Sequence, residues 1–263
     1  MFKKIFSIAS IAFFSSAVFA EPFVFDEGNF IVLNDQVSED SISKLTFDLL
    51  SNKNDVVKVY INSGGGSVVA MNEFISVLNA TDKKVECYAN FAASAAFTML
   101  QACDTRIASP ISSILMQHYG SYGLGQQPQN LQTSMIKMLD NLMYEFTENE
   151  RERIGGYSHE DYVSLIRNDW WSSGKQALER NIVDTLKFAT CTPELTKAKK
   201  IEKINYFGAN IELTFSKCPL IAAPLSIVFQ EEDKKRLTEE DVENIKTEVI
   251  NLYTNTEVIR KIL

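Results

Sequence analysis

The chain has 263 residues, 45% of them hydrophobic, which suffices for one large domain or for a domain with an appendage. Its formal net charge is −8 at pH 7, and its basic residues are scattered along the chain. This balance argues against nucleic acid and against an anionic membrane as partners.

Residues 1–20 have the pattern of a secretory signal peptide. Lys3 and Lys4 precede an apolar run over residues 5–14, and Val18-Phe19-Ala20 forms a small-residue cleavage pattern. The apolar run is shorter than the roughly 20 residues that a membrane span needs. We therefore expect cleavage after Ala20, a periplasmic or secreted mature protein and no stable membrane span. An uncleaved anchor is the alternative.

All four cysteines lie beyond this segment, at Cys87, Cys103, Cys191 and Cys218. An exported protein meets an oxidising environment, so two disulfides are expected. No Cys-x-x-Cys motif is present, which argues against a zinc site, and we expect no metal. Four cysteines allow three pairings. We favour Cys87 with Cys103, which flank one strand-helix unit, and Cys191 with Cys218.

Short apolar runs alternate with helical patterns through most of the chain. The runs predict strands at residues 30–33, 56–61, 85–88, 105–108 and 113–117. Helical spacing predicts a helix that Ser38 opens, and further helices over 68–78, 92–102 and 129–152. Ser158 and Asp161 are typical of the cap of a shorter helix. The alternation predicts an α/β domain with parallel strand pairing.

The C-terminal segment, residues 191–263, is predicted to be an α+β appendage of unknown role. Strands at 204–207 and 211–215, joined by Gly208-Ala209-Asn210, predict a β-hairpin. Thr238 and Asp241 form a predicted capping box for a following helix. The apolar stripe of that helix is expected to dock on the protein's own core, and it comprises Val242, Ile245, Val249, Leu252 and Tyr253.

One stretch carries the pattern of a serine nucleophile. Ser94 lies among small residues at a predicted strand-to-helix junction, after the glycine loop 62–68 and before His118. The chain has only two histidines, so the base would be His118 or His159. Without further context, Ser94 is equally well a small residue that permits helix packing. The glycine loop is not followed by Gly-Lys-Ser/Thr, which argues against a nucleotide site.

Five ordered blocks resemble those of the Clp protease proteolytic subunit family, and they cover about residues 29–190. The blocks are Phe30 to Val37, Tyr60 to Val68, Ala92-Ala93-Ser94, Met116-Gln117-His118 and Asp169 through Asp184. The resemblance implies the Clp/crotonase fold, built of repeated strand-strand-helix units, for residues 21–190. It also implies a protruding helix, which would be the predicted helix over 129–152.

The resemblance places the nucleophile at Ser94, the general base at His118 and the orienting carboxylate at Asp169. It places the backbone N–H donors of the oxyanion hole at Gly65 and Ala95. Hydroxyl, imidazole and carboxylate form a chemically sound relay in any chain order. The chain also departs from the family pattern: Gly64 replaces the usual proline of the glycine loop, and Trp170 replaces an arginine that helps to join rings. Assembly into the family's stacked rings is therefore left open.

The sequence thus predicts an exported serine endopeptidase that cleaves peptide or unfolded protein substrates without a cofactor or an ATPase partner. A homo-oligomer is expected, because the predicted helix over 129–152 carries more apolar residues than a solitary protruding helix would expose. One alternative is a Ser/Lys peptidase of the signal peptide peptidase A type, with Lys137 or Lys175 as the base. The other is an oligomeric binding or scaffold protein with an idle site.

Overall fold

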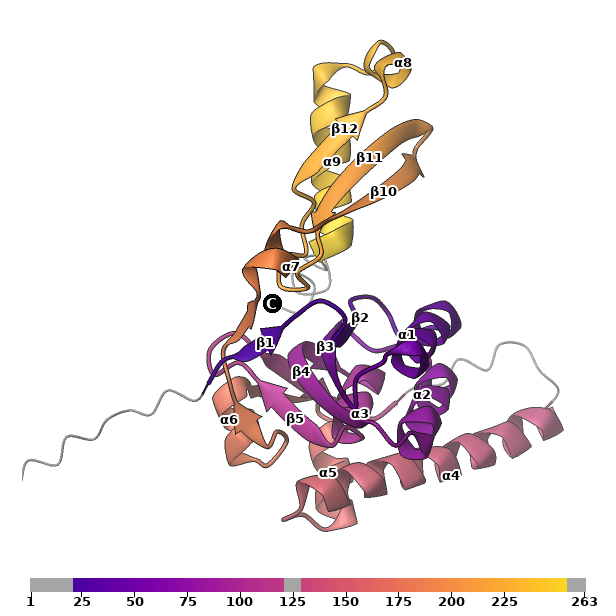
Figure 1. The fold of residues 1–263 in the computed structure, drawn as a ribbon. Coiled ribbons are helices and arrows are strands. Elements are labelled where there is room, and N and C mark those ends of the chain that lie inside the picture. The colour runs from indigo at the N-terminus through magenta and orange to yellow at the C-terminus, as the bar shows by residue number, and fades with distance from the viewer. Residues whose placement is uncertain (1–20, 121–128, 255–263) are drawn as a thin grey trace, which may run out of the picture.

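The computed structural model describes residues 21–120 and 129–254 (Figure 1). Five strands form a parallel sheet in the order β2-β3-β4-β5-β8. They are β2 (Phe30–Leu33), β3 (Val56–Ser63), β4 (Lys84–Ala93), β5 (Thr105–Ala108) and β8 (Thr185–Leu186). The predicted mixed α/β architecture with parallel pairing is confirmed.

Strand β4 is longer than predicted, and this places the candidate nucleophile. Its first half pairs with β5, while Phe91–Ala93 pair with β6 (Ile114–Gln117). The predicted helix start at Ala92 is wrong, since Ala92 and Ala93 belong to the strand and α3 (Ala95–Gln101) begins after Ser94. Alanine favours helices in isolation, but pairing with β3 and β6 on both sides decides its conformation here.

Side chains on β3 and β4 alternate between two apolar clusters, as the two-residue period of a strand requires. Val59 and Ile61 join the large core with α1 (Glu39–Ser51), α2 (Val68–Ala80) and α3. Tyr60 and Tyr88 face a second cluster with Phe23 and Phe25. These two phenylalanines lie on β1 (Phe23–Phe25), which pairs with β9 (Ala189–Cys191); neither strand was predicted, and each has three residues.

Three further helices complete this region: α4 (Gln129–Ile154), α5 (His159–Ile166) and α6 (Gly174–Glu179). The predicted cap of α5 is present, with the Asp161 N–H donating to Ser158 Oγ at 3.1 Å. The C-terminal half of α4 packs on the core through Phe146 and Ile154. Met138, farther toward its N-terminus, is 57% exposed, so part of the apolar surface of this long helix is uncovered within one chain (Figure 1).

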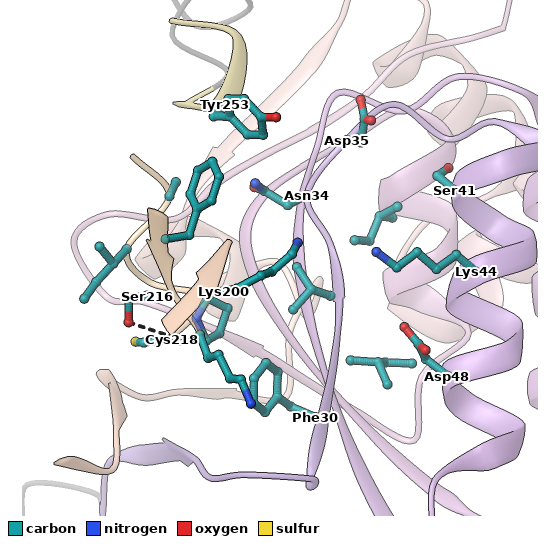
Figure 2. Close-up of a pocket in the computed structure, with 18 of the residues that line it drawn as sticks. Phe30, Asn34, Asp35, Ser41, Lys44, Asp48, Lys200, Ser216, Cys218 and Tyr253 are labelled. Atoms are coloured by element: carbon teal, nitrogen blue, oxygen red, sulfur yellow. Dashed lines mark hydrogen bonds between the residues drawn. The ribbon is translucent and has the colours of Figure 1, made fainter. Parts of the chain in front are cut away.

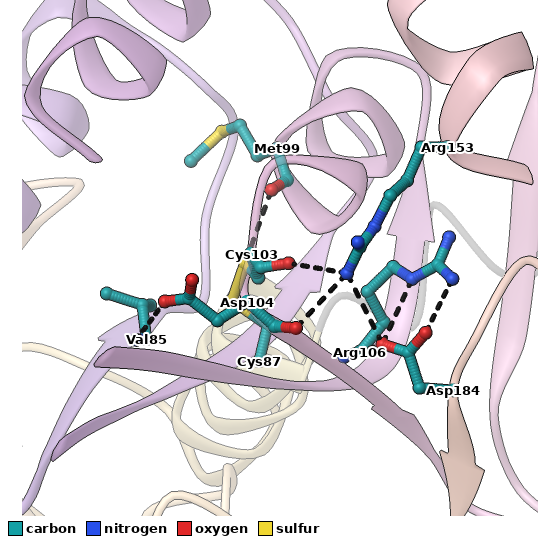
Figure 3. Close-up of a disulfide and its surroundings, with 8 residues drawn as sticks. All are labelled: Val85, Cys87, Met99, Cys103, Asp104, Arg106, Arg153 and Asp184. Atoms are coloured by element: carbon teal, nitrogen blue, oxygen red, sulfur yellow. Dashed lines mark hydrogen bonds and ion pairs between the residues drawn. A yellow bond between two sulfur atoms is a disulfide. The ribbon is translucent and has the colours of Figure 1, made fainter. Parts of the chain in front are cut away.

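Both favoured disulfides are present, Cys87–Cys103 and Cys191–Cys218, and the described residues include no free cysteine. Figure 3 shows the first beside an ion pair in which Arg106 Nη2 lies 2.6 Å from Asp184 Oδ1. Arg153 of α4 donates to the carbonyls of Cys103 and Asp104 at 3.3 and 3.1 Å. The bridge and these charges connect α4 to the sheet and to the segment that precedes β8.

The C-terminal unit, residues 199–254, forms a three-stranded antiparallel sheet with one long helix on it (Figure 1). Its strands are β10 (Lys199–Tyr206), β11 (Ala209–Ser216) and β12 (Ser226–Phe229), the last of which was not predicted. Between the sheet region and this unit lies α7 (Pro193–Lys197); α8 (Glu231–Lys234) and α9 (Glu239–Thr254) follow β12.

The hairpin turn of this unit is shorter than predicted. Tyr206 pairs with Ala209, so Phe207 and Gly208 alone form the turn, both with positive φ (49° and 82°). A two-residue turn with this backbone matches the twist of the two strands. The capping box of Thr238 and Asp241 is confirmed by reciprocal hydrogen bonds of 2.9 and 3.1 Å.

The apolar stripe of α9 packs against β10 to β12 in a core separate from that of the main sheet. Val249 is fully buried there, and Val242, Ile245 and Tyr253 pack around it. The inclusion of Leu252 in the stripe was wrong, because its side chain is 62% exposed. The apolar stripe of α9 therefore covers mainly the sheet of its own unit.

Candidate active site

Ser94 occupies the single residue between strand β4 and helix α3. Its backbone has φ 54° and ψ −125°, a conformation that costs a non-glycine residue about 1–3 kcal/mol. Its N–H donates to the Met116 carbonyl of β6 at 3.0 Å. The side chain makes no helix-capping hydrogen bond, although serine commonly caps helices. A strained strand-to-helix turn that presents a free hydroxyl is typical of a serine nucleophile.

His118 follows β6, and the pairing of β6 with the end of β4 brings it to Ser94. Its Nε2 lies 2.8 Å from Ser94 Oγ. Next in sequence, the Tyr119 N–H donates to the Ile166 carbonyl at 2.9 Å, which anchors the chain that leaves the histidine. With Nε2 unprotonated, the imidazole accepts the serine proton, which is the arrangement that general-base catalysis requires.

Asp169 lies beside His118 along the backbone, but the structure shows no hydrogen bond between their side chains among the described residues. Strand β7 (Trp170–Ser173) pairs antiparallel with β6, and the last pair in the ladder is Gln117 with Trp170. His118 and Asp169 are the next residues outward on the two strands. The Asp169 side chain is exposed, and no hydrogen bond or ion pair joins it to His118 among the described residues. The structure thus brings two of the three predicted side chains together.

Asp169 itself has a positive φ of 54° at the end of the loop that follows α5. Aspartate tolerates this conformation better than most residues, which fits its place at a tight turn. Its backbone N–H lies 3.4 Å from the Ile166 carbonyl.

Gly65 lies against the junction that carries Ser94, as the oxyanion assignment requires. A Cβ atom on Gly65 would lie 2.5 Å from the Ala93 carbonyl oxygen and 2.7 Å from Ser94 Cβ, and its φ is +89°. Only glycine fits this position. The Gly65 N–H donates to Ser63 Oγ at 3.2 Å, so a substrate oxyanion would have to share or displace this bond.

Ala95 is the first residue of α3, where backbone N–H groups have no acceptor within the helix. The positive end of the helix dipole adds to the attraction of such N–H groups for an anion. Both candidate oxyanion donors therefore lie beside Ser94.

The alternative bases lie elsewhere. Lys137 on α4 and Lys175 on α6 are exposed, and neither contacts Ser94 within the described part of the chain. His159 begins α5, where its Nδ1 lies 2.8 Å from Glu148 Oε2. Hydrogen bonds from Arg151 and then from His159 lower the pKa of Glu148 to about 2. His159 is therefore engaged in a surface ion-pair cluster.

A cavity of about 900 Å³ separates the main sheet region from the C-terminal unit (Figure 2). Lys44 and Asp48 of α1 line one side, while Lys200 of β10 and Tyr253 of α9 line the other. Two ion pairs lie in its lining, Lys200 with Glu202 and Lys217 with Glu27. Because none of the candidate catalytic residues lines it, volume alone does not identify the reactive site here.

Metal binding receives no support from the side chains. In residues 21–120 and 129–254, no group of three or more His, Cys, Asp or Glu side chains is placed to hold a metal ion. Nor is any helix of these residues long and apolar enough to cross a bilayer.

One buried acid close to the candidate site was not singled out in the sequence. Glu150 of α4 is 2% exposed and bonds to Gln117, the residue before His118. A signal for it was available, since Met143, Phe146, Glu150 and Ile154 recur at helical spacing. A carboxylate within an apolar stripe indicates a buried acid with polar partners.

Comparison with protein families identifies a match to the Clp protease family model over residues 20–189. A comparison with curated proteins found no match. The matched segment covers the sheet region and ends where the C-terminal unit is about to begin. Membership in this family implies a protease, which is a hydrolase, and members of the family typically form oligomers. Over most of its length, this chain belongs to the Clp protease family.

Proposed function

We propose that this protein is an exported serine endopeptidase that hydrolyses peptide bonds through Ser94, His118 and Asp169. The observation that carries the proposal is the 2.8 Å contact between Ser94 Oγ and His118 Nε2 at a strained strand-to-helix turn. Family membership supports the reaction class. The substrates would be peptides or unfolded proteins, and no ATPase partner or cofactor would be required.

In the proposed reaction, His118 Nε2 takes the Ser94 proton while Oγ attacks the carbonyl carbon of the substrate. The N–H groups of Ala95 and Gly65 stabilise the negative oxygen that develops. His118 then gives the proton to the leaving amine, and the same steps with water release the acyl group. Asp169 would turn toward the His118 ring on substrate binding and fix its tautomer.

The proposal extends to organisation and location. Residues 1–20 would be removed as a signal peptide, residues 21–190 would form a catalytic domain of the Clp/crotonase type, and 191–263 would be an appendage. The two disulfides support an oxidising compartment such as the periplasm or the exterior. Because such a compartment lacks ATP, the enzyme would act on short or unfolded chains without an ATP-driven partner.

We also propose a homo-oligomer in which α4 packs against its counterpart. Ile136 and Met138 on this helix are 41% and 57% exposed, and a partner helix would cover them. Sedimentation at micromolar concentration should show an oligomer that Met138→Glu weakens. A monomer at all concentrations would contradict this part of the proposal.

The central test is labelling of the purified protein with a fluorophosphonate probe, together with hydrolysis of a small ester. Ser94→Ala should abolish labelling, and Ser94→Ala and His118→Ala should each lower turnover by about 10³-fold or more. Ser76→Ala, which alters an exposed serine on α2, is the matched control and should label normally. Labelling that persists in Ser94→Ala would refute the nucleophile.

Asp169→Asn separates a complete triad from a serine-histidine pair. If Asp169 turns to His118 during catalysis, the variant should keep its fold and lose about 10²-fold to 10⁴-fold in turnover. Unchanged turnover would remove Asp169 from the mechanism and leave the pair intact. Near-normal activity in His118→Ala would instead favour a lysine base.

The lack of a hydrogen bond between Asp169 and His118 among the described residues favours a second candidate, an oligomeric binding protein whose site is idle. This alternative predicts no probe labelling and no ester hydrolysis by the intact protein. Binding of an unfolded reporter peptide, unaffected by Ser94→Ala, would support it.

A further inference from the structure

A buried cluster of four polar side chains lies directly behind the reactive pair. Thr98 comes from α3, Gln117 from β6, Glu150 from α4 and Tyr162 from α5. Their exposed fractions are 8%, 5%, 2% and 0%. Four elements that are distant in sequence therefore meet at one carboxyl group.

Glu150 is hydrogen-bonded through both of its oxygens. Its Oε1 lies 2.5 Å from Thr98 Oγ1 and 2.5 Å from Gln117 Nε2, while its Oε2 lies 2.7 Å from Tyr162 OH. Gln117 Nε2 also lies 3.2 Å from Thr98 Oγ1. All four side chains therefore belong to one hydrogen-bonded network.

No cation faces this carboxyl group among the described residues. Tyr162 from α5 is the one titratable side chain in contact with it, and α3 and β6 contribute neutral Thr98 and Gln117. On α4 itself, Arg151 and Arg153 are bonded elsewhere. Burial raises the pKa of Glu150 to about 7, against the opposing effect of its hydrogen bonds from Thr98, Tyr162 and Gln117.

The cluster is bonded to the backbone of both reactive residues. Gln117 Oε1 accepts the N–H of His118 at 3.1 Å. Thr98 donates its backbone N–H to the Ser94 carbonyl at 3.1 Å, and its Oγ1 lies 3.5 Å from the same oxygen. A change at Glu150 would therefore reach Ser94 and His118 through one intervening side chain each.

We propose that Glu150 is a positioning residue that, as a neutral acid, holds the Ser94–His118 pair in register through Thr98 and Gln117; this inference rests on the proposed function. Oε1 accepts from Thr98 and Gln117, and the protonated Oε2 donates to the Tyr162 oxygen. An ionised Glu150 would be a buried charge without a counter-ion, and the elements around it would shift to admit water. Small shifts at Ser94 or His118 are costly to acyl transfer.

The test compares Glu150→Gln with Glu150→Leu. Glutamine reproduces the neutral acid, because its amide accepts from Thr98 and Gln117 and donates to Tyr162. Leucine removes every hydrogen bond. Glu152→Gln, at a side chain 66% exposed on the same helix, is the control for the loss of one charge.

For a small ester at pH 6, Glu150→Gln should match the intact enzyme. Glu150→Leu should lower kcat about 10-fold to 100-fold at an unchanged KM. Between pH 6 and 8.5 the intact enzyme should fall at least about threefold relative to Glu150→Gln as Glu150 ionises. Glu152→Gln should follow the intact enzyme throughout. A folded Glu150→Leu variant with normal kcat, or identical pH profiles for the intact enzyme and Glu150→Gln, would overturn the proposal.

Two further measurements keep the inference decidable. If Glu150→Leu does not fold, Thr98→Val removes one link at nearly constant shape and should lower kcat in the same way. The NMR signals of the His118 ring, assigned with His159→Gln, should show a step that follows the ionisation of Glu150 and that Glu150→Gln abolishes. If the NMR step is observed but the protein hydrolyses no ester, only the proposed function is refuted. If the protein hydrolyses the ester but the NMR step is missing, only the role of Glu150 is refuted.

Discussion

Buried polar side chains have different surroundings in the sheet region and in the C-terminal unit. In the sheet region, Glu150 and its hydrogen-bond partners lie beneath the reactive pair and bond to its backbone. In the C-terminal unit, the buried Asp233 accepts the Asn210 N–H at 2.8 Å and contacts Arg236. This second arrangement stabilises the junction of β12, α8 and the hairpin.

The residues with positive φ also differ in their surroundings between the two regions. Ser94 adopts positive φ where a reactive hydroxyl is presented, whereas Phe207 adopts it in a two-residue hairpin turn. A positive φ thus accompanies the candidate nucleophile in one region and chain reversal in the other. What surrounds the residue, and not the conformation alone, indicates a site.

The largest effects should come from matched core truncations in the two regions. Leu115 of β6 and Leu213 of β11 are both fully buried, so Leu115→Ala and Leu213→Ala should each lower the unfolding free energy by about 2–5 kcal/mol. Leu115→Ala should also lower turnover, because it loosens the strand that carries His118. Denaturant unfolding and ester hydrolysis would measure the two effects. A loss of turnover per folded molecule in Leu213→Ala would contradict the separation.

Removal of the disulfides should have the next largest effect. The loops closed by Cys87–Cys103 and Cys191–Cys218 have sequence separations of 16 and 27. Loop-closure entropy predicts losses of about 3 and about 3.5 kcal/mol for the paired serine variants. Thermal unfolding would rank them, and only the first pair should alter probe labelling of Ser94. Four reactive thiols in the protein purified from the exported compartment would contradict both bridges.

The pH dependence of stability should differ in sign between the regions. Because burial raises the pKa of Glu150 to about 7 from 4.5, the folded state holds its proton more strongly than the unfolded state. The unfolding free energy should therefore fall by about 3 kcal/mol as the pH rises from about 4.5 to about 7. Urea unfolding of the intact protein and Glu150→Gln across this range would show the difference, and parallel curves would contradict it.

In the C-terminal unit, hydrogen bonds lower the pKa of two aspartates: those from Asn210 and Arg236 act on Asp233, and those from Thr238 on Asp241. Their stabilisation is present above the ordinary aspartate value of 3.8 and is lost as the pH falls through the lowered values. Acid should thus lower the stability of this unit, whereas a rise toward neutral pH should lower the stability of the sheet region.

The smallest effects should come from matched helix caps. Ser38 caps α1 and Thr238 caps α9, each in a capping box. Ser38→Ala and Thr238→Ala should each lower the unfolding free energy by about 1 kcal/mol. Ester hydrolysis by both variants should be unchanged. A drop in hydrolysis for Thr238→Ala would show that the C-terminal unit acts on the active site.

Much of the fold could be predicted because the signals are local. Strand periodicity located β2, β3 and β5 to within two residues, and the cap of α5 and the capping box of α9 were read from three-residue spacings. The end of β4 could not be read in this way, since Ala92 and Ala93 carry no strand preference and are extended through pairing with β3 and β6. The short β1 and β9 likewise exist through their mutual pairing.

For the site, the local pattern of small residues left Ser94 open as a packing residue and left two histidines as possible bases. The resemblance to the Clp protease blocks singled out Ser94, His118 and the glycine loop before any coordinates were known. Only the tertiary structure decided that Oγ and Nε2 meet, that Asp169 remains apart, and that Glu150 lies beneath them. These facts depend on which strand ends and helices converge, on side-chain rotation and on burial. Such quantities arise from contacts between residues far apart in the chain, so no local pattern encodes them.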